Sequence, residues 1–578
     1  MAGLPSTHEV ALTLRSLSLK QRRILLALGL LLIGLLVAIL WQVDQRASDL
    51  VATNGGSLTE GIIGTPRFIN PLLAASDADR DMVALVYSGL MRVGPDGQLI
   101  PDLAADYGVS EDQLTYTFTL RQDLSWHDGK PLTTDDVEFT VLKAQDPLLK
   151  SPKRASWAEI RVEKVSPTEI SFHLKQPYPQ FLENTTMGIL PKHLWNKLDT
   201  DTFSLNQFNI EPVGSGPYEI KSISKNNIGI ADYYDLKPFK NFALGRPKID
   251  LVRVRFYGNE AELAEAYQVR EIDSLSAISA ESAKMLAEAG AQILRAPLPR
   301  VFGVFFNQNK APVLANAEVR YALNLAVDRE EIIDTVLKGY GVPAEGPLPR
   351  LFLSEAGDVS TTTAADRIAA ARTYLDSHGW DWSEEKKVWE KKGKTNTQTL
   401  AFSITTSDTP ELKNSAELIK ATWEKLGAQV TLKVFEIGDL DLNIIRPRQY
   451  EALFFGEILG RTPDLFSFWN SQQRLDPGLN IAEYANTAVD KLLTEVRTLA
   501  DQDELSADYQ KIQDLITADI PAVFVYSPDF LYILPSQVKR VTLPPINTPS
   551  DRFLSIYHWY SATDRVWKIF INNTNSTH

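Results

Sequence analysis

Hydrophobic and polar residues alternate strictly between Leu114 and Leu120, where each apolar residue is followed by a single threonine. A period of two places all the apolar side chains on one face of an extended segment, which is typical of a half-buried β-strand. A turn-forming His-Asp-Gly sequence follows at 127–129, and Thr133 precedes Asp136 by three residues, the spacing of a helix capping box. The pattern therefore predicts a strand over 114–120 and a helix that begins near Thr134.

A strand, a helix and a second strand are predicted in succession between residues 400 and 434. Apolar residues alternate over Leu400–Ile404 and again over Val430–Val434, and between these strands they recur at steps of three and four. The apolar helix positions are Leu412, Ala416, Ile419, Trp423 and Leu426. Gly427 follows where a left-handed helix cap is expected. Because a crossover of this length favours parallel strands and a right-handed connection, this part of the chain is predicted to be α/β.

Two further helices are predicted in the segment 316–333, NAEVRYALNLAVDREEII. Apolar residues between Val319 and Ala326 repeat at helical spacing, and Asp328 stands three residues before Glu331, as an N-cap does before its N3 partner. Gly339 and Gly341 are expected to end the second helix.

An apolar run from Ile24 to Trp41 contains no charged residue. As a helix it would be about 27 Å long, close to the thickness of a bilayer core. Basic residues precede the run, so the positive-inside rule places residues 1–23 in the cytoplasm and the bulk of the chain outside. A cleavable signal peptide is the alternative, although no small-x-small motif follows Leu40 directly. We expect an uncleaved single-pass anchor over 24–41 in the cell membrane, followed by a flexible tether over 42–56.

Length, net charge and cysteine content exclude several kinds of partner and site. A chain of 578 residues is long enough for several domains, and its formal net charge of −14 argues against a nucleic-acid partner. The absence of cysteine excludes disulfides, thiol catalysis and zinc-thiolate sites, and it also excludes a lipid-modified N-terminal cysteine. The apolar run is therefore the expected means of membrane attachment.

Three segments are similar to motifs of one transport-protein family. They are 87–142, which includes PDGQLIPDLAADYGV and SWHDGKPLTTDDV, the VGSGPY sequence at 213–218, and the segment 304–338. With these segments the chain resembles the family 5 extracellular solute-binding proteins, the peptide-binding subunits of ABC importers. The resemblance extends from Leu58 to about Tyr560.

The resemblance implies a two-lobed α/β fold of the periplasmic-binding-protein type (class II) with an extra domain, preceded by the transmembrane helix. It places lobe I at 57–90, 206–300 and 526–565, the extra domain at 91–205, lobe II at 301–525 and a tail at 566–578. It also implies capture of short peptides by closure of the two lobes and delivery to the permease subunits of an ABC transporter. The expected partners are thus peptides, a permease and the membrane, and no cofactor is expected.

Candidate residues for the ligand follow from the resemblance. Relatives carry an acidic anchor for the α-ammonium group of the ligand in the region that matches 454–484, so Glu457 and Asp464 are alternative anchors. The structural alternatives are a surface charge for Glu457 and a helix cap for Asp464. Asn307 is expected to bond a peptide main chain. Phe306 matches the same strand as Asn307, which often faces the ligand in this family. Further candidates are Phe468, Trp469 and Trp423 as pocket walls, with packing in the core as the alternative, and Arg461 and Arg474 as carboxylate receptors.

Three other functions remain open at this point. A hydrolase is disfavoured because there is no HEXXH sequence, and Gly214-Ser215-Gly216 does not complete a nucleophile elbow. Non-peptide solutes such as sugars or nickel chelates are compatible with the same fold, although the seven histidines do not cluster. A peptide sensor or chaperone that serves no transporter is the third alternative.

Overall fold

The structure is a computed structural model that describes residues 16–178, 180–352, 363–393, 396–497, 499 and 502–568. The chain forms two compact units, one made of the residues up to Gly56 together with those from Tyr560 onward, and one that spans Ser57–Trp559. Most of the predicted cytoplasmic segment (residues 1–15) and of the predicted tail (residues 569–578) lies outside the described residues.

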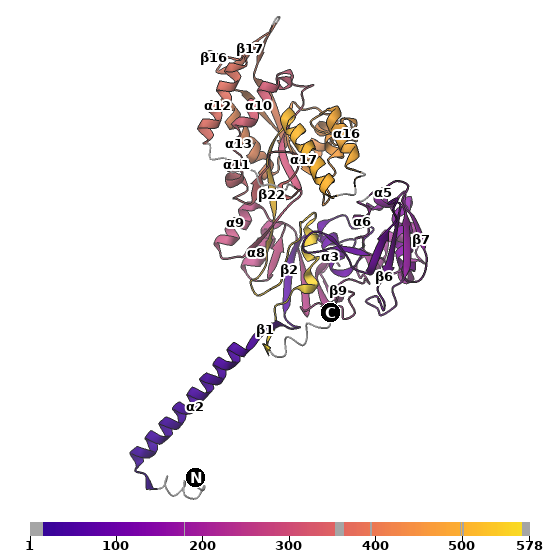
Figure 1. Ribbon diagram of the computed structural model, residues 1–578, viewed down its shortest axis with the longest axis vertical. Coiled ribbons are helices and arrows are strands. Elements are labelled where there is room, and N and C mark those ends of the chain that lie inside the picture. Colours follow the sequence, from indigo (N-terminus) through magenta and orange to yellow (C-terminus); the bar gives the residue numbers. More distant parts are fainter. Residues whose placement is uncertain are drawn as a thin grey trace. The chain divides into compact units, whose positions relative to one another are not determined.

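The first unit consists of a long helix and a two-stranded ribbon (Figure 1). Helix α2 (Leu19–Ala47) begins at Ser18 with a capping box formed with Gln21, has no buried residue, and is long and apolar enough to cross a membrane. Strand β1 (Ser48–Ala52) pairs with β23 (Thr563–Trp567) in antiparallel fashion. The structure thus differs from the predicted flexible tether over 42–56. Residues 42–47 continue the helix because polar residues such as Gln and Arg are good helix formers, and polarity alone does not end a helix.

The second unit is built on one large mixed sheet with the order β20-β19-β21-β14-β22-β12-β2-β11-β10-β9, in which β13 and β15 also pair with β22. The strands are β2 (Ser57–Ile63), β9 (Tyr218–Lys225), β10 (Ala231–Pro238), β11 (Leu251–Tyr257), β12 (Ser274–Ser276), β13 (Ile293–Pro297), β14 (Arg300–Phe306), β15 (Gly341–Pro343), β19 (Ala401–Ser407), β20 (Gln429–Phe435), β21 (Ala452–Ile458) and β22 (Ala522–Ile533). We call the part around β2, β9–β13 lobe I and the part around β14, β15, β19–β21 lobe II.

Strand β22 belongs to both lobes (Figure 1). Its first half pairs with β14 and β15 of lobe II, and its second half, from Asp529 to Ile533, pairs with β13 and β12 of lobe I. The chain crosses between the lobes a second time at Leu298 and Pro299, between β13 and β14. Two crossings of this kind are the usual construction of a hinge.

Lobe II contains the predicted strand-helix-strand unit. Strands β19 and β20 pair in parallel, and α13 (Pro410–Leu426) connects them. Gly427 caps this helix with φ of 114°, the left-handed conformation that glycine accepts most readily. The prediction for 400–434 is therefore confirmed, as are the helices α10 (Ala317–Ala326) and α11 (Arg329–Val336), the latter capped by the bond from Glu331 N to the Asp328 carboxylate.

The two faces of the lobe II sheet carry separate hydrophobic cores. Val304 and Phe306 of β14 belong to one core, and Val301 and Phe305 belong to the other, as alternation along a strand requires. Helices α10, α11, α12 (Ala364–Ser377) and α13 cover the first core, and α15 (Phe466–Trp469), α16 (Thr487–Glu495) and α17 (Gln502–Asp519) border the second. Lobe I is covered by α8 (Glu260–Gln268) and α9 (Ala280–Glu288).

The extra domain is a four-stranded antiparallel sheet with the order β5-β6-β8-β7. Its strands are β5 (Ala104–Val109), β6 (Thr115–Leu120), β7 (Arg161–Lys164) and β8 (Glu169–His173), and its helices are α4 (Thr134–Gln145), α5 (Arg154–Trp157), α6 (Phe181–Asn184) and α7 (Lys192–Trp195). Strand β6 and helix α4 confirm the predictions for 114–120 and Thr134. The short strands β3 (Met91–Val93) and β4 (Leu99–Pro101) precede this domain, and a small sheet of β16 (Asp381–Ser383), β17 (Val388–Lys392) and β18 (Thr397–Thr399) extends lobe II.

The VGSGPY turn returns the chain to lobe I just before β9. A Cβ atom on Gly214 would lie 2.0 Å from the carbonyl oxygen of Val86, which ends helix α3 (Asp77–Val86). The His127 ring bridges the turn, with Nε2 bonded to Gly216 O at 3.1 Å and Nδ1 accepting from Gly214 N at 3.2 Å. Burial lowers the pKa of His127 to about 4. This motif and its histidine thus act in packing.

Candidate functional site

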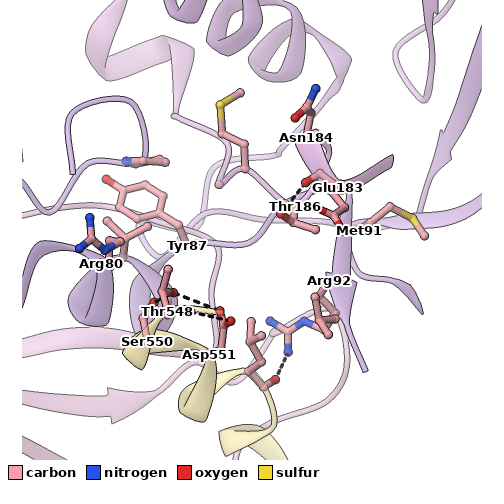
Figure 2. Close-up of a pocket in the computed structure, with 18 of the residues that line it drawn as sticks. Arg80, Tyr87, Met91, Arg92, Glu183, Asn184, Thr186, Thr548, Ser550 and Asp551 are labelled. Carbon is pink, nitrogen blue, oxygen red and sulfur yellow. Dashed lines mark hydrogen bonds between the residues drawn. The ribbon is translucent and has the colours of Figure 1, made fainter. Parts of the chain in front are cut away.

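A cavity of about 430 Å³ opens where α3 and the segment 87–93 face residues 547–554. Residues 152–157 and 183–188 and the side chain of Arg461 complete its wall. Around the open space, Figure 2 shows the side chains of Arg80, Tyr87, Thr548, Ser550, Asp551, Arg92, Glu183 and Thr186. The cavity therefore brings lobe I, the extra domain and one lobe II loop together at one place.

A second and larger hollow, of about 690 Å³, lies beside the same loop. It is lined by 97–99 and Tyr107 from the N-terminal part of the chain and, from lobe II, by Leu351, Phe352, Leu499, Leu505, Ser506 and Tyr509. Arg461 and Glu183 line both spaces. The loop after β21 thus borders both hollows.

This loop contacts the opposite side of the cavity through two polar interactions. Arg461 Nη2 lies 2.8 Å from Asp551 Oδ2, and both side chains are about nine-tenths removed from solvent, with 14% and 13% exposed. Thr462 Oγ1 donates to Glu183 Oε1 at 2.5 Å. These contacts join lobe II to lobe I and to the extra domain.

A fully buried ionic cluster fixes the residue next to Asp551. The guanidinium of Arg552 donates to both oxygens of Asp81 at 2.9 and 2.8 Å and to Glu60 at 3.0 Å. Tyr532 of β22 donates to the second oxygen of Glu60 at 2.9 Å. Although burial disfavours the charge of Arg552, the carboxylates of Asp81 and Glu60 raise its pKa. The 3-10 helix η8 (Pro549–Phe553) is therefore held rigidly against α3, β2 and β22.

The three arginines that line the first cavity are each paired with a carboxylate, and the lining carboxylate of Glu183 accepts a hydrogen bond from Thr462. Arg92 is bonded to Asp102 at 2.9 Å, Arg461 to Asp551 at 2.8 Å and Arg80 to Asp77 at 2.6 Å. In the described part of the chain, no carboxylate or carbonyl accepts a hydrogen bond from the ammonium of Lys153. The Lys153 residue is exposed, although the surrounding protein partly desolvates its ammonium, and together with the charge of Arg80 this desolvation lowers the pKa of Lys153.

The hydroxyl group of Tyr87 is a second unsatisfied group on this wall. The side chain is buried and, within the described residues, its oxygen has no hydrogen-bond partner. Buried polar groups in native proteins are nearly always bonded, so the unpartnered hydroxyl of Tyr87 on this cavity wall points to a polar ligand. The sequence singled out neither residue as a ligand candidate, although Tyr87 begins the family-like segment 87–142.

The structure places Glu457 inside lobe II rather than in either hollow. Its side chain is buried at the end of β21, where one carboxyl oxygen accepts from Trp469 Nε1 at 3.1 Å and the other has no partner among the described residues. Burial raises the pKa of Glu457 to about 8. Burial therefore favours the protonated form of this carboxyl group. Its role as an ammonium anchor stays a prediction.

The other predicted residues lie apart from one another. Asp464 is about half exposed and accepts from Phe466 N at 3.2 Å, as a helix cap does. The Asn307 amide is buried and bonded to Arg448 O and Glu483 at 3.2 Å each. The predicted aromatic residues pack inside lobe II: Phe306 and Trp423 lie in one core and Trp469 in the other. Phe468 borders that second core.

Of the two predicted arginines, Arg474 is exposed and donates to Ser471 O. Of the six principal candidates, only Arg461 lines the two hollows.

The chain matches the family model described as bacterial extracellular solute-binding proteins, family 5 Middle, over residues 98–475. The chain belongs to this family. It is 26% identical over 497 residues to the oligopeptide-binding protein AppA of Bacillus subtilis, covering 85% of this chain and 90% of the relative. It is 25% identical over 546 residues to the dipeptide-binding protein of Escherichia coli, covering 90% of this chain and 96% of the relative.

Solved structures of family 5 proteins share the fold. The AppA structure from Bacillus subtilis, in complex with a nonapeptide, superposes with a TM-score of 0.64 at 25% identity and covers 89% of this chain and 100% of AppA. The ABC transporter substrate-binding protein CtaP of Listeria monocytogenes gives a TM-score of 0.71 at 29% identity, covering 88% of this chain and 100% of CtaP. The predicted two-lobed α/β fold with an extra domain is thereby confirmed.

Proposed function

We propose that this family 5 solute-binding protein is a membrane-anchored receptor that captures short peptides outside the cytoplasm and delivers them to the permease of an ABC importer. The observation that carries the peptide assignment is the cavity wall, where groups of both charges lie around the Tyr87 hydroxyl, which has no hydrogen-bond partner among the described residues. A peptide offers carboxylate, amide and ammonium groups, which match a wall of mixed charge. The names of the relatives, oligopeptide-binding and dipeptide-binding protein, agree with this ligand. The ligand is released unchanged.

Lys153 receives a carboxylate of the peptide in this proposal. An ammonium inside a protein cavity gains from an anionic partner because fewer water molecules compete for it there than in bulk solvent. The approach of a carboxylate also reverses the cause of the lowered pKa of Lys153, since it replaces lost water and offsets the charge of Arg80. A C-terminal carboxylate and an acidic side chain both satisfy this requirement.

The ammonium end of the peptide has two candidate anchors, Glu457 and Asp464. Glu457 would have to lose its proton to pair with an ammonium group, because burial raises its pKa to about 8. Peptide binding at pH 7 would then release about one proton. Calorimetry in two buffers of different ionisation enthalpy measures this release, and binding with no proton release assigns the ammonium to Asp464 or to another acceptor.

Closure traps the ligand. We propose lobe I at 57–90, 206–300 and 526–565, the extra domain at 91–205 and lobe II at 301–525, with the hinge at the two crossings, β22 and Leu298-Pro299. The ion pair between Arg461 and Asp551 and the bond between Thr462 and Glu183 act as the closing contacts. A ligand that adds contacts to both sides shifts the equilibrium towards the closed form.

The membrane part of the proposal is an uncleaved anchor formed by residues 24–41 of α2. N-terminal sequencing of the protein isolated from membranes tests it. The intact N-terminal region is expected, and a chain that starts near residue 45 to 50 would identify a cleaved signal instead.

The carboxylate assignment is tested with trialanine and trialanine amide, which differ only in the C-terminal charge. A hydrogen bond to a charged group contributes about 1.5–3 kcal/mol, so the amide is expected to bind the natural protein roughly 10- to 100-fold more weakly. In Lys153→Gln this ratio falls to near one, whereas Lys175→Gln, which removes an exposed ammonium outside the cavity, retains it. Equal binding of acid and amide to the natural protein refutes the carboxylate site. Failure of alanine peptides of two to six residues to bind at all contradicts the peptide assignment.

A further inference from the structure

The end of the chain returns to the helix from which the chain starts. Strand β23 pairs with β1 over five residues, from Ser48 opposite Trp567 to Ala52 opposite Thr563. Side chains reinforce the pairing at the helix end, where Trp567 Nε1 donates to Asp44 Oδ1 at 2.8 Å and Lys568 Nζ lies 3.7 Å from Asp49. The last described residues are thus bonded both to β1 and to the final turn of α2. We call β1, β23 and this final turn the juxtamembrane ribbon.

The two strands stay in contact beyond the ladder. Thr53 N donates to Ala562 O at 3.1 Å. A Cβ atom on Gly56 would lie 2.1 Å from Ser561 Oγ, and Gly56 adopts φ of 80°, so both space and backbone conformation favour glycine there. The outgoing and the returning segments therefore pass each other closely up to the point where the second unit begins at Ser57 and ends at Trp559.

The ribbon begins where the apolar surface of α2 ends. Trp41 is exposed and stands three residues before Asp44, so the two side chains lie on one face of the helix, one turn apart. Trp567, bonded to Asp44, is brought to that same face, and its ring is 45% exposed. Two tryptophan rings thus lie within about one helical turn, roughly 5 Å along the axis, at the outer end of the apolar segment.

Tryptophan is enriched at the level of lipid headgroups, because its ring is apolar and its N–H is polar. We propose that the juxtamembrane ribbon is a membrane-contact surface whose partner is the outer phospholipid headgroup layer, with Trp567 and Trp41 as its aromatic anchors. This inference rests on the uncleaved anchor of the proposed function. Without this lipid contact, strand β23 would expose the indole ring of Trp567 to water next to the bilayer.

This arrangement has a mechanical consequence for the receptor. A single flexible tether would let the solute-binding unit rotate freely about the end of α2. The ribbon instead joins that unit to the membrane through two covalent connections, residues 53–56 and 560–562, which bond to each other. The unit Ser57–Trp559 is therefore connected to the first unit at two points of the chain.

The pairing is tested by disulfide formation, and the chain is well suited to this because it contains no cysteine. Val51 and Asp564 stand directly opposite each other in the ladder. Opposed residues in an antiparallel pair have Cα atoms about 4.5–5.5 Å apart, which a disulfide can span. Full-length Val51→Cys/Asp564→Cys protein in its membrane should form this disulfide in most molecules. The matched pair Val51→Cys/Arg565→Cys, whose side chains point to opposite faces, should not.

The lipid contact is tested by a fluorophore attached at position 567 in Trp567→Cys protein, reconstituted into vesicles of phosphatidylcholine and phosphatidylglycerol. Nitroxide-labelled headgroup lipid should quench this fluorophore at least several-fold more than one attached in Thr563→Cys, about 13 Å further along β23. Equal quenching at the two positions overturns the lipid contact. Equal disulfide yield in the two cysteine pairs refutes the pairing of β1 with β23. This result does not depend on the fluorophore experiment, because both cysteine pairs retain Trp567.

These outcomes are separable from failure of the proposed function. Extraction of the protein from membranes by alkaline carbonate would refute the anchor itself, and peptide calorimetry measures the receptor. A protein that resists carbonate and binds peptide, but fails the disulfide test, refutes the ribbon alone.

Discussion

Replacement of Arg461 by glutamine should weaken ligand binding without destabilising either lobe. The guanidinium lies 2.8 Å from Asp551 and is mostly shielded from water, so a movement of lobe II away from lobe I would expose both groups. A hydrogen bond to a charged group contributes about 1.5–3 kcal/mol. Asp551 retains bonds from the backbone N atoms of Asn547 and Thr548, at 2.8 and 3.1 Å, so the loss should lie towards the lower part of this range.

The closed form is then destabilised relative to the open form by about 1.5–2 kcal/mol, and affinity coupled to closure falls roughly 10- to 30-fold. Isothermal calorimetry with a bound peptide measures the affinity, and small-angle scattering measures the fraction closed. Arg474→Gln is the matched control, because this exposed arginine belongs to the same lobe and donates to Ser471 O within its own loop. Equal peptide affinity in natural and Arg461→Gln protein would refute the closing role of this ion pair.

Two further predictions concern buried charges. Arg552→Met leaves the carboxylates of Glu60 and Asp81 buried without their cation, so it should lower the free energy of unfolding by about 3–5 kcal/mol. The control Arg161→Met removes an exposed ion pair and should lower that free energy by less than about 1 kcal/mol. Equal melting temperatures of the two variants would contradict the prediction. Because burial raises the pKa of Glu457 from 4.5 to about 8, the folded protein keeps a proton that the unfolded chain has released, so stability contributed by this group falls as pH rises through that window. Denaturation curves measured from pH 4.5 to 8 should show this slope in natural protein and a flatter profile in Glu457→Gln, and parallel profiles would disprove the assignment.

Local periodicity was sufficient to predict the elements whose stability depends on one buried face. The bounds of strand β6, helix α4 and the unit β19-α13-β20 were each predicted to within a few residues. Alternation and helical spacing depend only on residues that are close together in the sequence. Strand β22 was not predicted as one element. It contains Pro528 and reads as short apolar pieces, and only its pairing with strands of both lobes makes it continuous.

The site was less accessible to sequence reasoning than the fold. Arg461 was predicted to face a carboxylate, and the carboxylate that it meets in the closed protein is Asp551, 90 residues away in the chain. Lys153 becomes a candidate only because the arginines that line its cavity are paired with carboxylates, and the tertiary structure is needed to recognise these pairs. Tyr87 is similar, since its missing hydrogen bond is a property of the surrounding packing.

Mass spectrometry of the compounds that co-purify with the full-length protein tests the central claim most directly. The protein is extracted from its membrane in detergent, washed and denatured, and the released small molecules are identified. The account predicts a mixture of short peptides that share a free carboxylate. A single defined compound that is not a peptide would contradict the assignment of ligand.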